Sequence, residues 1–163
     1  MVENNEILEH VYIAPGSYRN FSGRIDAFNK TGDKKFSVFL PADVAADLEG
    51  IGWYIKHKPP YQEGGDPQYQ LDIAVGYDRW PPSVKVKASD GTETYLTQDT
   101  VGILDSMDIA DATVEIRPYN WEVNGKTGCK AYLRELTVTA RPPRSTRNAR
   151  MQRRDTEESE AAW

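Results

Sequence analysis

Alternation of apolar and polar residues predicts β-strands along most of the chain. The predicted strands cover residues 19–29, 35–40, 53–58, 69–75 and 83–88, and two longer ones follow at about 111–123 and 128–140. Short helices are predicted at 41–49, where Pro41 suits the first position and Gly50 the end, and at 97–107. Short strands with two brief helices are typical of a small β-barrel or an α+β sheet.

The last two predicted strands meet at Asn124-Gly125, which is the strongest short signal for a two-residue hairpin. This turn pairs Val123 with Lys126 and thereby sets the register of the whole hairpin. On one face the register places Arg117 opposite Tyr132, Tyr119 opposite Lys130, Trp121 opposite Gly128, and Glu115 opposite Arg134. The other face carries Cys129, Ala131 and Leu133, which we expect to point inward.

Gly125-Lys126-Thr127 also matches the end of a phosphate-binding P-loop, an interpretation that the surrounding residues exclude. The P-loop needs a glycine five residues before Gly125, and Asn120 stands there. It also needs a helix after the threonine, whereas the alternation after Gly128 predicts a strand. These three residues therefore belong to a hairpin turn.

The outward face of the predicted hairpin combines aromatic rings with positive charges. Exposed bases of single-stranded nucleic acid stack on such rings at about 1–3 kcal/mol each, while cations follow the phosphates. Tyr and Trp also favour strands in general, and Arg117 with Tyr132 makes an ordinary cross-strand pair. The pattern alone leaves the binding and the structural interpretations open.

Length and charge narrow the class of protein. The 163 residues fit one domain, 1–140, with an appendage at 141–163. The net charge of −5 by itself argues against nucleic-acid binding, and residues 1–140 carry 14 basic and 21 acidic side chains. Binding responds to local potential, however, so a narrow basic groove remains compatible with this total.

Apolar runs, the N-terminal residues and the cysteine count indicate the cellular compartment. The sequence contains no run of about 18 apolar residues, so no membrane-spanning helix is predicted. The N-terminal residues MVENNEILEHVYI lack the pattern of a signal peptide, and the single cysteine fits a reducing cytoplasm. We therefore expect a cytoplasmic protein.

The C-terminal segment differs from the rest of the chain. Residues 141–154 carry six arginines and no acid, whereas residues 155–160 carry four acids and no base. Apart from Trp163 the segment has no aromatic residue and almost nothing apolar, so we predict a flexible, disordered tail. The arginines either hold phosphate loosely or neutralise the acids that follow.

The hairpin sequence RPYNWEVNGKTGCKAYLRELTVT, preceded by DTVGILDSMDI, resembles a family of single-stranded-DNA-binding proteins encoded by tailed bacteriophages. RNFSGRIDAFN, FSVFLP and GWYIK match upstream segments of that family, so the resemblance spans about residues 19–140. It implies an OB fold, a five- to seven-stranded Greek-key barrel that binds oligonucleotides across one face. It also implies sequence-independent DNA binding in phage replication or recombination, in the cytoplasm of the bacterial host. The helix at 41–49 is an addition to the family's pattern.

The resemblance and the residue pattern together define the candidate site. The first group is Arg117, Tyr119, Trp121, Lys130, Tyr132 and Arg134, and the second group is Arg24, Lys35, Phe39 and Trp80. Trp80, in the sequence DRWPP, either clamps a base or stabilises its turn against proline. For the tail, the resemblance to other replication proteins implies that an acidic tip docks into a partner or competes with DNA. Its candidate residues are Asp155, Glu157, Glu158, Glu160 and Trp163, and the bland alternative is a solubilising tail.

Catalytic and metal chemistry find no support in the sequence. His10 and His57 lie far apart without ligand-like partners, so we expect no metal and no cofactor. The carboxylates of Asp105, Asp108 and Asp111 flank a helix end and a strand start, where aspartate commonly caps and turns. We therefore expect a binding protein, not an enzyme. The alternative is an OB-like adaptor that uses the hairpin as a protein interface, and the sequence does not distinguish a monomer from a dimer.

Overall fold

The computed structural model describes residues 2–13, 18–27, 29–60, 62–78 and 80–141. In chain order the elements are β1 (Glu6–Val11), β2 (Arg19–Asn20), β3 (Lys34–Leu40), α1 (Ala42–Ile51), β4 (Lys56–Lys58), β5 (Gln68–Val75), β6 (Ser83–Lys87), β7 (Glu93–Leu96), the 3-10 helix η1 (Val101–Asp105), β8 (Ile109–Val123) and β9 (Lys126–Ala140). Among the described residues, no helix has the length and apolar character needed to span a membrane.

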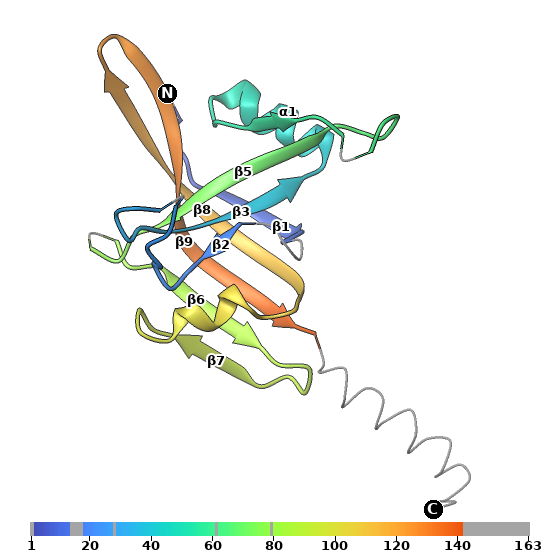
Figure 1. Ribbon diagram of the computed structural model, residues 1–163, viewed down its shortest axis with the longest axis vertical. Coiled ribbons are helices and arrows are strands. Elements are labelled where there is room, and N and C mark those ends of the chain that lie inside the picture. Colours follow the sequence, from blue (N-terminus) through green and yellow to red (C-terminus); the bar gives the residue numbers. More distant parts are fainter. Residues whose placement is uncertain (1, 14–17, 28, 61, 79, 142–163) are drawn as a thin grey trace, which may run out of the picture.

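Within the described residues the strands form one mixed sheet. Its main path runs β1-β8-β9-β5-β3-β2, with β4 added to β5 and β6 pairing with both β9 and β7. Most pairs are antiparallel, but β9 runs parallel to β5 and to β6. An isolated bridge, in which Phe39 N–H donates to the Tyr12 carbonyl at 3.1 Å, brings the chain after β1 back to β3. The sheet thus curls around one core (Figure 1), and the prediction of a mainly β fold is confirmed.

The core lies inside this curl and is built from the inward positions of the long strands. Many inward residues of β3, β5, β8 and β9 are at most 2% exposed, among them Phe36, Val38, Leu71, Ile73, Val114, Ile116, Ala131, Leu133, Leu136 and Val138. Phe21 stacks on Phe36 with ring centroids 4.7 Å apart. Fully burying such a side chain contributes about 1.5–3 kcal/mol, so these positions dominate the stability of the fold.

The predicted helix at 41–49 is confirmed as α1. Pro41 precedes it in an extended conformation, and Ala45 and Leu48 form its buried face. The helix ends at Ile51 and is capped by Gly52, whose φ of 127° is costly for other residues and whose N–H donates to the Leu48 and Glu49 carbonyls. The following Trp53 is buried, whereas Tyr54 is 63% exposed.

The predicted strand at 19–29 is wrong beyond Asn20. Asn20 and Asn29 hold the Arg24 carbonyl with their side-chain amides at 3.0 and 2.8 Å, and Gly23 has a φ of 76°. Because asparagine side chains compete with a ladder for backbone groups, this segment forms a loop. Ile25, which alternation assigns to the core, is 74% exposed in that loop.

Other element boundaries also differ from the sequence prediction. The strand predicted at 53–58 begins only at Lys56, and the helix predicted at 97–107 is the 3-10 helix η1. The sequence did not predict β1 or β7. In β1 a register shift between Leu8 and Val11, with a positive φ at His10, breaks the period-two alternation. No residue of β7 is buried, so that strand has no apolar face to detect.

The register of the last hairpin is confirmed from Val123–Lys126 to Ile116–Leu133. Asn124 and Gly125 have φ values of 52° and 80°, as a type I′ turn requires. The predicted pairing of Glu115 with Arg134 is wrong because a bulge at Glu115/Ile116 places Glu135 opposite Glu115. The Arg134 Nε atom nevertheless lies 3.6 Å from Glu115 Oε2.

Candidate nucleic-acid interface

The outer half of the β8–β9 hairpin, residues 117–132, projects beyond the rest of the sheet, and we name it the arm (Figure 1). The ladder of β1 reaches β8 only as far as Ile116, and β5 pairs with β9 only at Ala131 and Tyr132. From Tyr119 to Thr127 every side chain is exposed. From Tyr119 to Thr127 the arm is therefore a two-stranded ribbon that pairs with no other strand of the described residues.

One face of the arm carries a ladder of cross-strand pairs with mixed chemistry. The pairs are Arg117–Tyr132, Tyr119–Lys130, Trp121–Gly128 and Val123–Lys126. Each pair joins a ring or an apolar side chain to a cation or a glycine. Because the aromatic member changes strand between the first pair and the second, rings and charges interleave along the arm.

The rings on this face contact one another and the neighbouring cations. Tyr119 and Tyr132 meet edge to face with centroids 5.8 Å apart, and Lys130 Nζ lies 5.3 Å from the Tyr132 ring centre. The Arg117 guanidinium carbon lies 4.7 Å from the centre of the Trp80 ring. Such contacts hold rings and cations in place without neutralising the charge. Tyr119 remains 43% exposed and Trp121 39% exposed.

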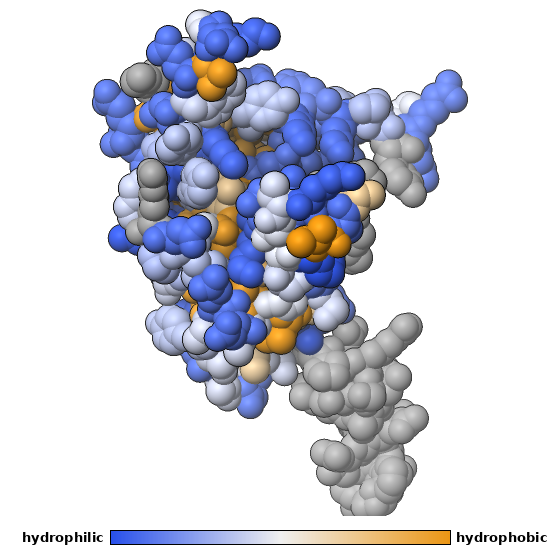
Figure 2. All heavy atoms as spheres, turned by 60° about the vertical axis from the view of Figure 1, so that its left-hand side comes forward, coloured by the Kyte–Doolittle hydropathy of each residue, from blue (hydrophilic) through white to orange (hydrophobic). Residues whose placement is uncertain are grey.

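A groove of about 1290 Å³ runs along this face of the arm. Its other wall is formed by residues 31–35 at the start of β3, by residues 72–78 of β5 and the loop after it, and by Tyr54. Figure 2 shows the arm's side of the molecule as a largely hydrophilic surface with apolar residues visible in depressions between polar ones. Seven predicted site residues line the groove: Arg117, Tyr119, Trp121, Lys130, Tyr132, Lys35 and Trp80.

The cations of the arm face the groove without an acidic partner. Among the described residues, no carboxylate oxygen lies within 4.0 Å of a side-chain nitrogen of Arg117, Lys126 or Lys130. Lys35, on the other wall, lies 5.4 Å from the Tyr18 ring centre. The arm therefore offers positive charge that is free to pair with an incoming anion.

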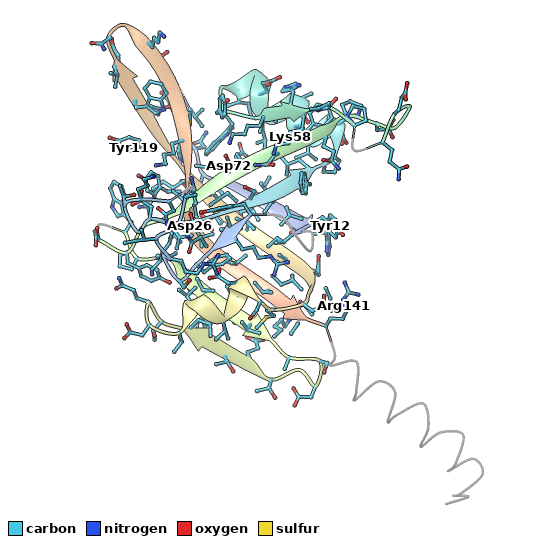
Figure 3. All side chains as sticks on the ribbon, viewed as in Figure 1. Tyr12, Asp26, Lys58, Asp72, Tyr119 and Arg141 are labelled. Carbon is cyan, nitrogen blue, oxygen red and sulfur yellow. The ribbon has the colours of Figure 1, made fainter. Side chains whose placement is uncertain are left out.

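The carboxylate of Asp72 lies in the groove on β5 (Figure 3), and its charge is engaged by the protein itself. Ser37 Oγ and Gln70 Nε2 each donate to Asp72 Oδ1 at 2.6 Å, and Lys56 Nζ lies 2.5 Å from Oδ2. Burial raises the pKa of Asp72, but the hydrogen bonds from Lys56, Ser37 and Gln70 outweigh it and lower the pKa overall. The Lys56 ion pair reduces the repulsion that this acid exerts on a phosphate.

The structure does not bring Arg24, Phe39 and Arg134 into the groove. Arg24 Nη1 ion-pairs with Asp105 Oδ2 at 3.3 Å. The same carboxylate accepts the Phe21 backbone N–H at 2.6 Å and so holds this loop in place. Phe39 lies at the end of β3, where its backbone bridges to Tyr12. Arg134 lies below the arm and ion-pairs with Glu115. The predicted tail residues Asp155, Glu157, Glu158, Glu160 and Trp163 lie outside the described residues.

Two aromatic residues of the groove, Tyr54 and Tyr77, are absent from the site predicted from the sequence. Tyr54 follows the buried Trp53, and alternation alone leaves open which of the two faces outward. Tyr77 belongs to the loop after β5, where no periodic pattern marks its side chain. Its hydroxyl is buried with no hydrogen-bond partner among the described residues, and burial raises its pKa.

Asp105, Asp108 and Asp111, which are close in the sequence, each bind a different partner in the structure. Asp105 anchors the loop at Phe21, Asp108 lies 3.1 Å from Arg141, and Asp111 lies 2.9 Å from His10. No cluster of three or more His, Cys, Asp or Glu residues that could hold a metal occurs in the described part of the chain. Burial raises the pKa of the inward-facing Cys129, which keeps it a thiol and disfavours a role as nucleophile.

Comparison with solved structures shows where this fold recurs. The single-stranded DNA-binding protein from bacteriophage Enc34 in complex with ssDNA is similar over 85% of this chain and 88% of that chain, with a TM-score of 0.54 and 11% identity. A C-terminal truncation of the same Enc34 protein matches over 85% and 87%, with a TM-score of 0.54 and 12% identity. At such low identity the likeness shows the fold alone. A comparison with curated proteins found no match.

The family comparison covers nearly the whole domain. Residues 3–147 match the model described as "Putative phage ssDNA-binding domain", which includes every strand, both helices and the complete arm. The match extends well beyond half of the 163 residues. The chain therefore belongs to the family of putative phage ssDNA-binding domains.

Proposed function

We propose that the protein binds single-stranded DNA without sequence preference and serves phage replication or recombination in the host cytoplasm. The observation that carries the proposal is the ladder of rings and cations that the arm presents to the groove, where those cations have no acidic partner among the described residues. Tyr119, Trp121 and Tyr132 stack bases, because every base has a π-face that a ring can cover. Arg117 and Lys130 pair with the phosphates between those bases. Membership of the family supports this function.

The geometry favours single strands over duplexes. Stacking on a protein ring requires a base whose face is free, and duplex bases are already stacked on their neighbours. The proposed mechanism is binding without bond making or breaking, so DNA incubated with the protein is expected to be recovered unchanged. Electrophoresis of a labelled oligonucleotide after incubation with the protein tests this part of the proposal.

A salt titration tests the binding itself. The anisotropy of a fluorescently labelled dT oligonucleotide is measured against protein concentration at several salt concentrations. The logarithm of the association constant is expected to fall linearly with log salt, with a slope near −0.7 for each phosphate contacted. Binding that is absent, or that does not respond to salt, contradicts the proposal.

A protein-adaptor function is the second candidate, and one observation favours it. Val123 at the tip of the arm is 58% exposed and has no evident role in holding DNA. Exposed Tyr, Trp and Arg residues are also typical of protein interfaces. A pull-down that depends on the arm and retains no nucleic acid after nuclease treatment supports the adaptor. Loss of the captured protein on nuclease treatment supports DNA binding.

We further propose that residues 1–140 form the DNA-binding domain and that residues 141–163 act as a separate tail. The acidic tip with Trp163 docks into a phage replication or recombination protein, or competes with DNA for the groove. The titration is repeated with a chain that ends at Ala140. Tighter binding by the shortened chain indicates competition by the acids, and weaker binding indicates that the arginines contact DNA.

A further inference from the structure

The indole of Trp121 lies directly on the backbone of Gly128, its cross-strand partner on the arm. A Cβ atom built at Gly128 would lie 2.5 Å from Cζ2, 2.6 Å from Cε2 and 2.9 Å from Nε1 of the indole. Ordinary contacts between carbon atoms are about 3.5–4.0 Å. The ring thus occupies the space that any other residue at position 128 would fill.

The backbone conformation does not explain why position 128 is a glycine. The described glycines with positive φ include Gly125 in the turn, but not Gly128. A glycine inside a strand weakens it and often marks the close approach of another group. At Gly128 the close group is the indole, so the ring is what requires a residue without a side chain.

A second ring-over-glycine contact in the groove shows what a looser arrangement looks like. A Cβ atom at Gly76 would lie 3.4 and 3.5 Å from Cε1 and Cδ1 of Tyr132, which is ordinary van der Waals contact. An alanine at Gly76 is therefore compatible with the Tyr132 ring as it stands. At Gly128 the same substitution forces the Trp121 ring to move.

We propose that Gly128 is a positioning residue for single-stranded DNA: it seats the Trp121 indole against the arm so that the free ring face meets a base. This inference rests on the proposed function. Among the described strands only β5 pairs with the arm, and only at Ala131 and Tyr132, so without the seat the indole is free to take other rotamers. Holding the ring in place before DNA arrives removes the cost of ordering it on binding.

The first test needs no DNA and follows the ring directly. Near-ultraviolet circular dichroism is recorded for the full chain, for Gly128→Ala, for Trp121→Ala and for the double variant. Gly128→Ala is expected to change the aromatic signal of the otherwise native chain but to leave the spectrum of the Trp121→Ala chain unchanged. An unchanged spectrum in the native background overturns the inference, because the ring then had no need to move.

The second test links the ring position to DNA affinity through the same four proteins. Trp121→Ala is expected to weaken binding to a labelled dT oligonucleotide by about 5- to 150-fold. Gly128→Ala alone is expected to cause a large part of that loss of affinity. In the Trp121→Ala background it is expected to change the affinity by less than about two-fold, because the effects of neighbours that act as one unit are not additive. Gly50→Ala, where the new Cβ meets nothing within 4 Å, is the matched control on α1.

The remaining outcomes separate the inference from the function. If Gly128→Ala weakens binding equally in both backgrounds, its effect is on the arm as a whole and the positioning role is overturned. If Trp121→Ala weakens binding and Gly128→Ala does not, stacking stands and the inference falls. If the protein binds DNA but neither variant changes affinity, the positioning role falls while the function survives. If the unmodified chain binds no DNA, both fall.

Discussion

The arm and the root of the last hairpin are built from the same two strands but have opposite environments. In the root, residues 109–116 and 133–140, alternate positions such as Val114 and Leu136 are completely buried. There β1 covers the edge of β8, and β6 pairs along β9. On the arm the same alternation continues, but from Tyr119 to Thr127 every side chain is exposed. Alternation thus predicts which residues share a face of the hairpin. Whether that face is buried depends on the neighbouring strands.

The two regions also differ in how they treat positive charge. Arg134 of the root lies 3.6 Å from the Glu115 carboxylate, whereas Arg117 of the arm lies against the uncharged Trp80 ring. A carboxylate in an ion pair neutralises the positive charge, whereas an uncharged ring leaves that charge available to a ligand. We infer that the root stabilises the fold and that the arm binds. The following substitutions test this division.

The largest expected effect is on stability and belongs to the root. Leu136→Ala removes a side chain that is 0% exposed and leaves a cavity in the core. Its free energy of unfolding is expected to fall by about 2–5 kcal/mol. Tyr119→Ala, on the arm, is expected to change that quantity by only about 0.5 kcal/mol or less. Urea unfolding curves of the two variants measure both values, and equal losses contradict the division.

The second effect is on affinity and belongs to the arm. Tyr119→Ala is expected to weaken oligo-dT binding by about 1–3 kcal/mol, because one stacking surface is lost. Tyr12→Ala is the matched control, since Tyr12 is also an exposed tyrosine, at 57%, but lies on the other side of the molecule (Figure 3). Anisotropy titrations at one salt concentration compare the two variants. A comparable loss in Tyr12→Ala indicates that exposed rings bind DNA without a defined groove.

The sequence predicted the arm well because its evidence is local. Asn124-Gly125 set the register, and the paired rings and cations followed from counting along two strands. The opposite wall was largely missed, because Tyr54 and Tyr77 reach the groove only through tertiary packing. Arg24 was assigned to the groove because RNFSGRIDAFN alternates, yet hydrogen bonds from asparagine side chains turn that segment into a loop. Charge pairing such as Arg24–Asp105, 81 residues apart, is invisible to a local pattern.

The third prediction concerns the junction between arm and body. The Asn120 side chain receives the Val2 N–H at 3.2 Å and donates to the Val2 carbonyl at 2.7 Å, which ties the N-terminal segment to the arm. Asn120→Ala removes both hydrogen bonds, each worth about 0.5–1.5 kcal/mol. We expect the free energy of unfolding to fall by about 1–2 kcal/mol, because both hydrogen bonds are partly buried and Val2 is only 3% exposed. Urea unfolding measures it, and a loss as large as that of Leu136→Ala contradicts a local tie.

The smallest effect tests whether the arm keeps the charge of Arg117 available. A double-mutant cycle of Trp80→Ala and Arg117→Ala is expected to give a coupling of about 0.5–1 kcal/mol in the free energy of unfolding, as for other exposed cation–π pairs. Arg117→Ala is also expected to make the salt slope of DNA binding less steep by about 0.7, because one phosphate contact is lost. Arg117→Lys keeps the charge but loses the planar guanidinium over the Trp80 ring, so it is expected to retain the slope while weakening the coupling. If Arg134→Ala in the root changes the slope as much as Arg117→Ala does, pairing with Glu115 does not withhold that charge, and the electrostatic part of the comparison fails.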